Sequence, residues 1–226
     1  MLVAIAFIGG SYLFGTLPFT AALARMSGVD VSRERDLHLA LQRKASNVLA
    51  SLASFVDAIK GGIPILIEFG FGLPSAVVAS SGVAAVAGQM WPPFRNCHGE
   101  KGNSIGAAVI ITLALIYESY FTLISLIPFA IGFGLRYIGY RQLREPTHPM
   151  VLALPIGMLL GFAVAPAASW SSGQAKNITL GLLALFTIIT VRRLTAYLKE
   201  DLKIGSSTTS ILLNRLLFDR SFVEKS

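Results

Sequence analysis

The sequence predicts an all-α, polytopic integral membrane protein with about seven transmembrane helices. Of its 226 residues, 54% are hydrophobic and only 14% are charged, whereas a typical soluble domain has about 25% charged residues. The apolar residues come in nearly charge-free runs of roughly 15 to 24, the length range of segments that cross a hydrocarbon layer. A water-soluble globular protein is therefore not expected.

Seven apolar segments are expected to be the membrane-spanning helices. They cover approximately residues 2–24, 46–69, 74–91, 104–118, 120–138, 149–169 and 177–191. The fourth segment is short for a hydrocarbon layer of ~30 Å. No basic residue precedes the first segment, so we interpret it as a retained helix and not as a cleaved signal peptide. We expect residues 1–196 to form the membrane domain and residues 197–226 a cytoplasmic amphipathic tail.

Basic residues are distributed unevenly between the two sides of this arrangement. Lys and Arg number 19 against 12 Asp and Glu, a formal net charge of +7. Nearly all of them lie in alternate connections between the predicted helices, and the intervening connections contain only Lys176. Because basic loops remain cytoplasmic, we expect the N-terminus outside the cell and the C-terminus in the cytoplasm. The positive charge therefore requires no nucleic-acid partner.

The tail after the last predicted span has an amphipathic pattern. Its apolar residues near one helical face are Ile211, Leu212, Leu216 and Phe218. This pattern predicts a helix at the level of the lipid headgroups, with Arg215 and Arg220 facing anionic lipid. A frayed tail is the alternative.

Asp57 and Lys60 are charged residues inside the second predicted span. An ionised side chain near the bilayer centre costs about 2.5 to 3.5 kcal/mol, and residues three apart on a helix can form an ion pair. We therefore expect both side chains to face the interior of the helix bundle. Gly61, Gly62 and Pro64 follow directly and would permit a broken helix or a close approach of another backbone, next to protein or a water-filled cavity. The pair could belong to a functional cavity or be purely structural. Glu68 is expected near the outer surface, with no assigned role.

A glycine-rich connection surrounds Lys101 in the segment WPPFRNCHGEKGNSIG, just before the fourth predicted span. A glycine-rich turn that enters a helix exposes backbone N–H groups to an anion, and the lysine adds a full positive charge. We interpret the segment as a candidate phosphate site, with a plain turn as the alternative. The spacing is not that of a Walker motif. The single cysteine, Cys97, excludes an intramolecular disulfide, and no Cys/His spacing indicates a closed zinc site.

Several of these motifs, taken in order, resemble those of the bacterial acyl-phosphate:glycerol-3-phosphate acyltransferases, the PlsY family. GSYLFG at residues 10–15 and ALARMSGVDV at residues 22–31 resemble the first family motifs. DAIKG at residues 57–61 matches D-x-x-K-G, and AVAGQMWPPF followed by HGEKG resembles G-H-x-x-P-x-F followed by G-G-K-G. The interval from Gln89 to Lys101 agrees with the family interval from histidine to lysine.

The resemblance implies transfer of a fatty acyl group from acyl phosphate to glycerol 3-phosphate. The product would be lysophosphatidic acid, a phospholipid precursor, made in the bacterial cytoplasmic membrane without a metal or other cofactor. The expected partners are these two substrates and membrane lipid, and no protein partner is identified. By resemblance, Lys101 and Gln89 occupy the catalytic positions, with Gln89 in place of the family histidine. The substrate-binding positions would be Gly99, Gly102, Ser11, Asp57, Lys60, Arg192 and Arg193.

The chain departs from the family pattern at four places that contact substrate. The loop S-G-N-x-G-A-T-N, expected between Asp30 and Asp57, is absent, and Gln89 replaces a histidine. Glu100 replaces the second glycine of G-G-K-G, and the final R-H-x-x-N-I motif is reduced to two arginines. His38 and His98 are expected in surface loops. The sequence therefore leaves two alternatives, an acyltransferase and a non-catalytic relative that binds lipid or acts as a scaffold. A small transporter is disfavoured because the hydropathy shows no inverted repeat.

Overall fold

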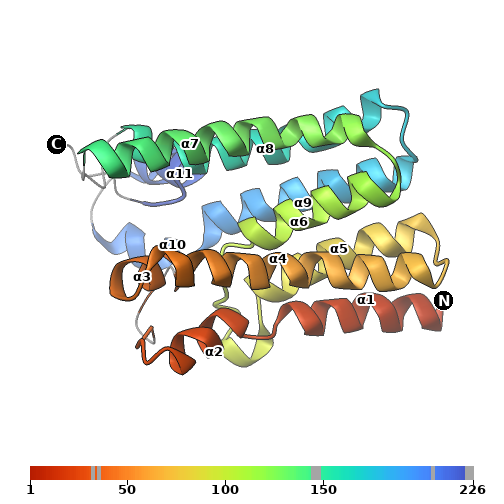
Figure 1. The fold of residues 1–226 in the computed structure, drawn as a ribbon, viewed down its shortest axis with the longest axis horizontal. Helices are drawn as coiled ribbons and strands as arrows, with labels where there is room; N and C mark the ends of the chain where they lie inside the picture. Colours follow the sequence, from red (N-terminus) through yellow and green to blue (C-terminus); the bar gives the residue numbers. More distant parts are fainter. Residues whose placement is uncertain (32–33, 35–36, 144–148, 205–206, 222–226) are drawn as a thin grey trace.

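The computed structural model describes residues 1–31, 34, 37–143, 149–204 and 207–221, and within these ranges the regular elements are all helices. The helices are α1 (Leu2–Gly15), α2 (Phe19–Met26), α3 (Leu37–Lys44), α4 (Asn47–Gly70), α5 (Ser75–Met90), α6 (Asn103–Ile116), α7 (Leu126–Leu143), α8 (Pro149–Ser171), α9 (Lys176–Thr195), α10 (Leu198–Asp201) and α11 (Thr208–Phe218), with short 3₁₀ turns at Pro93–Arg95, Tyr120–Ser125 and Leu202–Ile204. The long helices run side by side, and α2, α3, α10 and α11 lie at the end of the bundle away from the N-terminus (Figure 1).

All seven predicted segments are helical, although the first is divided between two helices. Within the part of the chain that the structure describes, five stretches are long and apolar enough to cross a membrane: Leu2–Met26, Asn47–Gly70, Tyr120–Gly139, Leu152–Ser171 and Lys176–Asp201. Helix α6 is apolar but has only 14 residues, and α5 has 16. The all-α membrane fold is therefore confirmed, and the number of seven spans stays a prediction.

The first predicted segment is not one continuous helix. It is divided between α1, which ends at Gly15, and α2, which begins at Phe19. Pro18 lies at the junction, where its lack of a backbone N–H and its steric effect on the preceding residue favour a helix boundary. The break leaves the carbonyl group of Leu17 outside a regular helix, and this oxygen accepts a hydrogen bond from Lys60 at 3.1 Å.

Helix α4 shows the opposite outcome, because it continues through Gly61, Gly62 and Pro64 without a break. Of the two alternatives for this glycine-rich segment, the close approach of another backbone is the one observed. A Cβ atom on Gly61 would overlap the carbonyl oxygen of Ile105 in α6. The glycine thus allows α6 to lie directly against α4.

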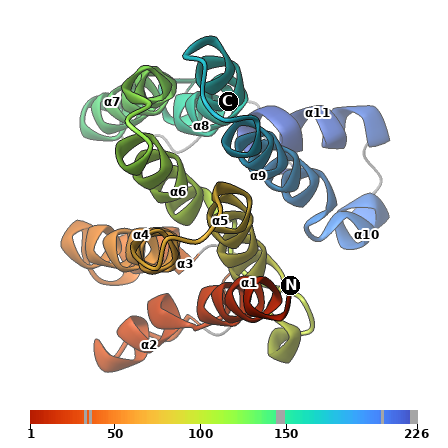
Figure 2. The same cartoon turned by 90° about the vertical axis from the view of Figure 1, so that its right-hand side faces the viewer.

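Helix α5 is central in the bundle and packs against α1, α4, α6 and α9 (Figure 2). Its residues Val78 and Val86 join a buried apolar core with side chains of α6, α8 and α9, including Phe162 and Leu185. Helices in lipid associate through close packing and not through the exclusion of water, which favours small residues at their interfaces. The contact between α5 and α1 follows this rule, since a Cβ atom on Gly15 would overlap the carbonyl oxygen of Ala85.

The tail helix α11 packs against α8 and α9. Ile211 and Arg215 are buried, and Arg215 forms an ion pair with Asp201 at 2.5 Å and donates to the carbonyl oxygen of Leu194 at 3.1 Å. The predicted helix is thus present, but the expectation that Arg215 faces lipid is wrong, and the position of this helix at the level of the headgroups stays a prediction. A guanidinium that can neutralise a buried carboxylate and bind backbone carbonyls gains more from these partners than from solvent-exposed headgroups.

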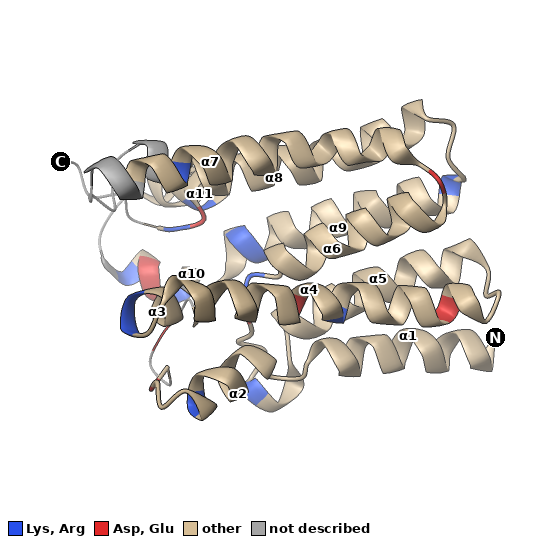
Figure 3. Cartoon of the chain, in the orientation of Figure 1, with Lys and Arg blue, Asp and Glu red and all other residues tan. Residues whose placement is uncertain are grey.

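Basic residues gather at the end of the bundle that carries α2, α3 and α10, while the N-terminus lies at the opposite end (Figure 3). This clustering agrees with the predicted orientation, in which the basic end is cytoplasmic. The orientation itself stays a prediction that labelling can test.

We predict that replacing Gly15 by alanine destabilises the protein, because the added methyl group would push α1 away from α5. Overpacking of this kind costs about 1 to 3 kcal/mol. The matched control is Gly10→Ala in the same helix, since a Cβ atom there meets nothing within 4 Å. Thermal unfolding in detergent should show a lower Tm for Gly15→Ala and an unchanged or higher Tm for Gly10→Ala. Equal Tm values would contradict this packing.

We also predict that Cys97 is accessible only from the cytoplasm. It is the single cysteine and is exposed at the basic end of the bundle. A membrane-impermeant maleimide should not label it in right-side-out spheroplasts and should label it after permeabilisation. A variant with Cys97→Ser and Lys176→Cys moves the thiol to the opposite end and should be labelled without permeabilisation. The reverse pattern would overturn the orientation.

Candidate active site

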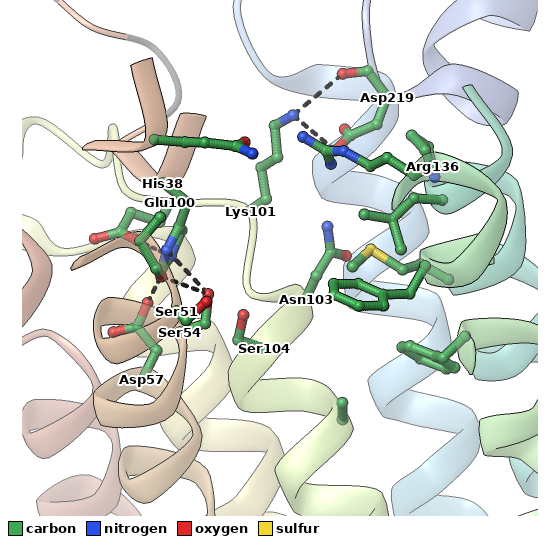
Figure 4. Close-up of a pocket in the computed structure, with 18 of the residues that line it drawn as sticks. His38, Ser51, Ser54, Asp57, Glu100, Lys101, Asn103, Ser104, Arg136 and Asp219 are labelled. Carbon is green, nitrogen blue, oxygen red and sulfur yellow. Dashed lines mark hydrogen bonds and ion pairs between the residues drawn. The ribbon is translucent and has the colours of Figure 1, made fainter. Parts of the chain in front are cut away.

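A cavity of about 850 Å³ lies at the end of the bundle that carries α3 and α11. Helices α4 and α7 form two of its sides, and α3, α8 and the start of α6 also contribute lining residues. Figure 4 shows polar side chains on the side of α3 and α4, with Lys101 near the middle. The cavity therefore joins the glycine-rich connection before α6 to the intramembrane charges of α4.

The polar wall is organised by His38 on α3, which contacts two carboxylates. Its Nε2 atom lies 3.0 Å from Asp57 Oδ2 and 3.3 Å from Glu100 Oε2. Its Nδ1 atom lies 3.3 Å from the hydroxyl group of Ser54. The expectation that His38 belongs to a surface loop is therefore wrong. His98 is exposed, as expected.

Asp57 and Lys60 form the predicted ion pair. Lys60 Nζ lies 3.0 Å from Asp57 Oδ1, and both side chains are only 1% exposed. Thr20 of α2 donates a hydrogen bond to Asp57 Oδ2 at 3.2 Å. The pair thus faces the interior of the bundle, as predicted, because exposure of either charge to lipid would be costly.

The charges of this wall depend on one another. Burial alone would lower the pKa of His38, but its hydrogen bond to Asp57, its close contact with Glu100 and the negative charges of both outweigh burial and raise that pKa to about 10. Burial raises the pKa of the Glu100 carboxyl, and the close contact with His38 opposes this increase. At neutral pH His38 is therefore an imidazolium, held between the carboxyl groups of Asp57 and Glu100.

Lys101 lies at the entrance to α6. Its Nζ atom is 3.0 Å from Asp219 Oδ2, and the lysine side chain remains 41% exposed. Gly102 is the N-cap residue of α6 and has a φ angle of 75°, a left-handed conformation that favours glycine. The first backbone N–H groups of α6 follow directly, and such groups attract anions at a helix N-terminus.

The second wall of the cavity is apolar. It contains Phe129 and Phe133 of α7 together with Leu154 and Met158 of α8. Phe133 is 64% exposed, so this wall reaches the outer face of α7. Arg136 of α7 lies at the polar end of the same wall (Figure 4). One cavity thus presents cationic groups at one end and an apolar surface beside them.

The predicted site residues divide into three groups. Asp57, Gln89, Lys101 and Gly102 line the cavity. Lys60 contacts Asp57 from the interior, and Gly99 is not a lining residue but directly precedes Glu100, which is one. The positions of Lys101 and Gly102 are consistent with the anion site expected there, and the substrate roles of all these residues stay predictions.

The third group comprises the two arginines and Ser11, which have other partners. Arg192 donates to the carbonyl oxygen of Gly99 at 2.7 Å, and Arg193 donates to the carbonyl oxygens of Pro155 and Leu216. Both arginines are buried and fasten α9 to neighbouring backbone. Ser11 donates to the buried Glu68 at 3.0 Å and is not among the residues that line the cavity.

Among the cavity residues that the sequence did not single out as site residues are three charged or titratable ones, His38, Arg136 and Asp219. His38 precedes Ala40 and Leu41, which are buried in a small apolar cluster. Together with the buried Leu37 they have the i, i+3, i+4 spacing of one helical face, and this spacing is the sequence signal that α3 packs onto the bundle. No local pattern indicates that Asp219 meets Lys101, 118 positions away in sequence.

Comparison with known proteins agrees with this geometry. The family model described as glycerol-3-phosphate acyltransferase matches residues 5–200. Glycerol-3-phosphate acyltransferase 4 of Dehalococcoides mccartyi is 30% identical, in an alignment that covers 97% of this chain and 90% of that protein. The glycerol-3-phosphate acyltransferase of Rubrobacter xylanophilus is 33% identical over 106 residues, which are 46% of this chain and 53% of that protein.

The fold also matches solved structures. Two crystal structures of PlsY (YgiH), an integral membrane glycerol 3-phosphate acyltransferase, are similar to this chain with 21% sequence identity. The glycerol 3-phosphate form has a TM-score of 0.64, with 89% of this chain and 90% of that chain covered. The lysophosphatidic acid form has a TM-score of 0.65, with 93% and 99% covered. The resemblance found in the sequence motifs is therefore confirmed, and the chain belongs to the glycerol-3-phosphate acyltransferase family.

Proposed function

We propose that this protein transfers a fatty acyl group from acyl phosphate to glycerol 3-phosphate in the bacterial cytoplasmic membrane. A hydroxyl oxygen of glycerol 3-phosphate forms a bond to the acyl carbon, and the bond between that carbon and the phosphate oxygen breaks. The hydroxyl proton passes to the departing phosphate. The products are lysophosphatidic acid and inorganic phosphate.

The observation that carries this proposal is a single cavity with a cationic end and an apolar wall. Both substrates carry phosphate, which Lys101 and the N-terminus of α6 can bind by charge and by backbone hydrogen bonds. Phe129, Phe133 and Met158 offer an apolar surface to the acyl chain of the donor. Because this wall reaches the outer face of α7, a lipid-like donor could enter from the bilayer.

Side chains of α3 and α4 provide polar groups where the family loop S-G-N-x-G-A-T-N is missing. Asn47, Ser51 and Ser54 line the cavity together with His38, and all four lie within the interval where the loop is expected. An amide or a hydroxyl group can donate to phosphate oxygens as a backbone N–H does. We infer that these side-chain donors take the place of the backbone donors of the loop.

The replacement of the family histidine by Gln89 is compatible with this chemistry. Acyl phosphate already contains a good leaving group, so catalysis can depend mainly on positioning the substrates and neutralising phosphate charge. The relatives reported above are acyltransferases, which favours catalysis over the alternative of a non-catalytic lipid-binding or scaffolding protein. The clustering of basic residues at the cavity end supports a reaction on the cytoplasmic side.

We predict that Lys101→Ala weakens binding of glycerol 3-phosphate or acyl phosphate. A hydrogen bond to a charged group contributes about 1.5 to 3 kcal/mol, which corresponds to roughly a ten- to hundredfold loss of affinity. The measurement is transfer of radiolabelled acyl groups by purified protein in lipid bilayers, together with equilibrium binding of glycerol 3-phosphate. The matched control is Lys199→Ala, because Lys199 is an exposed lysine that does not line the cavity. Absence of transfer by the wild-type protein would contradict the proposed function, and equal effects of both variants would remove Lys101 from the site.

We predict that Asp219→Asn strengthens phosphate binding, because the carboxylate of Asp219 neutralises Lys101 in the absence of substrate. The pair is partly exposed, and such pairs contribute at most about 1 kcal/mol, so the expected gain in affinity is up to about fivefold. Titration of the purified variant with glycerol 3-phosphate measures this gain. Glu118→Gln is the control, since Glu118 is exposed and belongs to the connection after α6. Weaker binding by Asp219→Asn would mean that Asp219 positions Lys101 and does not compete with the substrate.

A further inference from the structure

We propose that His38, Asp57 and Glu100 form a binding site for one divalent transition-metal cation, of the class of Zn²⁺, on the polar wall of the cavity. The three residues come from α3, α4 and the connection between α5 and α6. The site thus depends on the tertiary fold and has no local sequence motif. Its existence does not depend on the proposed acyl transfer.

The distances among the three ligand atoms suit a small cation. Atoms His38 Nε2, Asp57 Oδ2 and Glu100 Oε2 are candidates, and one potential ligand atom from each residue lies within 4.8 Å of the others. Nε2 is 3.0 Å from Oδ2 and 3.3 Å from Oε2. In a tetrahedral zinc site with metal–ligand bonds of about 2.0 to 2.1 Å, neighbouring ligand atoms are roughly 3.3 Å apart. A cation could therefore bind with only small side-chain movements.

The groups around the ligands would hold them in a suitable orientation. Ser54 Oγ donates to the carbonyl oxygen of Ala50 at 3.1 Å and can therefore accept a hydrogen bond from His38 Nδ1. This arrangement leaves Nε2 as the metal-binding nitrogen, in the way that hydrogen-bonded partners fix the tautomer of a metal-bound histidine. Lys60 holds the second oxygen of Asp57. The metal would displace the proton that His38 carries in its absence.

Glu100 provides an independent observation. Its buried Oε2 atom forms an ion pair with His38 at 3.3 Å from Nε2, but among the described residues it has no partner that meets hydrogen-bond geometry. A buried carboxylate oxygen without a hydrogen bond is energetically unfavourable. A cation between Glu100 and His38 would satisfy this oxygen.

The ligand set indicates which cation would bind. One imidazole nitrogen and two carboxylate oxygens suit Zn²⁺ and related first-row ions, whereas Mg²⁺ prefers six oxygen ligands. Three protein ligands leave a fourth tetrahedral position open, as in catalytic zinc sites. All three residues line the cavity, so the open position could accept water or a phosphate oxygen. The use of this position by a substrate phosphate is the only part that rests on the proposed function.

The test is metal binding by the full-length protein, purified in detergent after treatment with a chelator and dialysis. Titration with Zn²⁺ by calorimetry should give one site per chain, and titration with Mg²⁺ should give binding at least tenfold weaker. Co²⁺ in place of Zn²⁺ should give the visible absorption bands of a four-coordinate ion. Substrates are absent from these measurements, so a failure of acyl transfer would leave their outcome unaffected.

The variants His38→Ala and Glu100→Gln should each weaken Zn²⁺ binding by at least tenfold. Their matched controls, His98→Ala and Glu118→Gln, remove an exposed residue of the same type and should leave binding unchanged. Circular dichroism and thermal unfolding would verify that each variant is folded, and Glu100→Gln carries the test if His38→Ala is not. No binding by the wild type, or binding that the site variants do not weaken, would overturn the proposal.

Discussion

The buried carboxylate of Asp57 is the constraint on which the arrangement of the cavity depends. An unpaired charge inside a membrane helix is costly, and Asp57 avoids this cost through contacts with Lys60, His38 and Thr20. Through these contacts His38 helps to fix the position of α3 and Thr20 helps to fix the position of α2, both relative to α4. Lys60 also binds the carbonyl group of Leu17, so the break between α1 and α2 supplies both an acceptor for the lysine and, through Thr20, a donor for the aspartate.

The same interaction places α3 over the end of α4. His38 is attached to Asp57, and its second carboxylate partner, Glu100, belongs to the connection that leads into α6. Consequently the imidazole links the polar side of the cavity to the segment that carries Lys101. On the opposite side, Asp219 joins Lys101 to the end of α11. The glycine-rich connection is thus held between two ionic contacts, which gives the start of α6 a defined position relative to both walls.

The sequence was most informative where physical constraints are local. The apolar runs predict the long helices, and the three-residue spacing of Asp57 and Lys60 predicts their ion pair because both lie on one helix. The break at Pro18 and the continuity of α4 at Pro64 were not predicted, since a proline can be tolerated inside a membrane helix whose neighbours compensate for it. His38 and Asp219 escaped detection because the residues that they contact are distant in the sequence. The burial of Arg215 likewise depends on Asp201, which no periodicity in α11 reveals.

The departures from the family motifs have a common physical consequence. A glycine-rich loop binds phosphate through backbone N–H groups, which are uncharged and insensitive to residue type. Here the described part of the same region is mostly helical, in α3 and the first turns of α4. Most of its backbone N–H groups are therefore occupied by intrahelical hydrogen bonds, and contacts to a ligand fall mainly to side chains. A site made of side chains can contain ionisable groups, which a backbone site lacks. The cluster of His38, Asp57 and Glu100 is an example. Ligand binding at this wall therefore depends on the protonation of these residues and on bound cations. Ligand binding by a backbone loop would depend on neither.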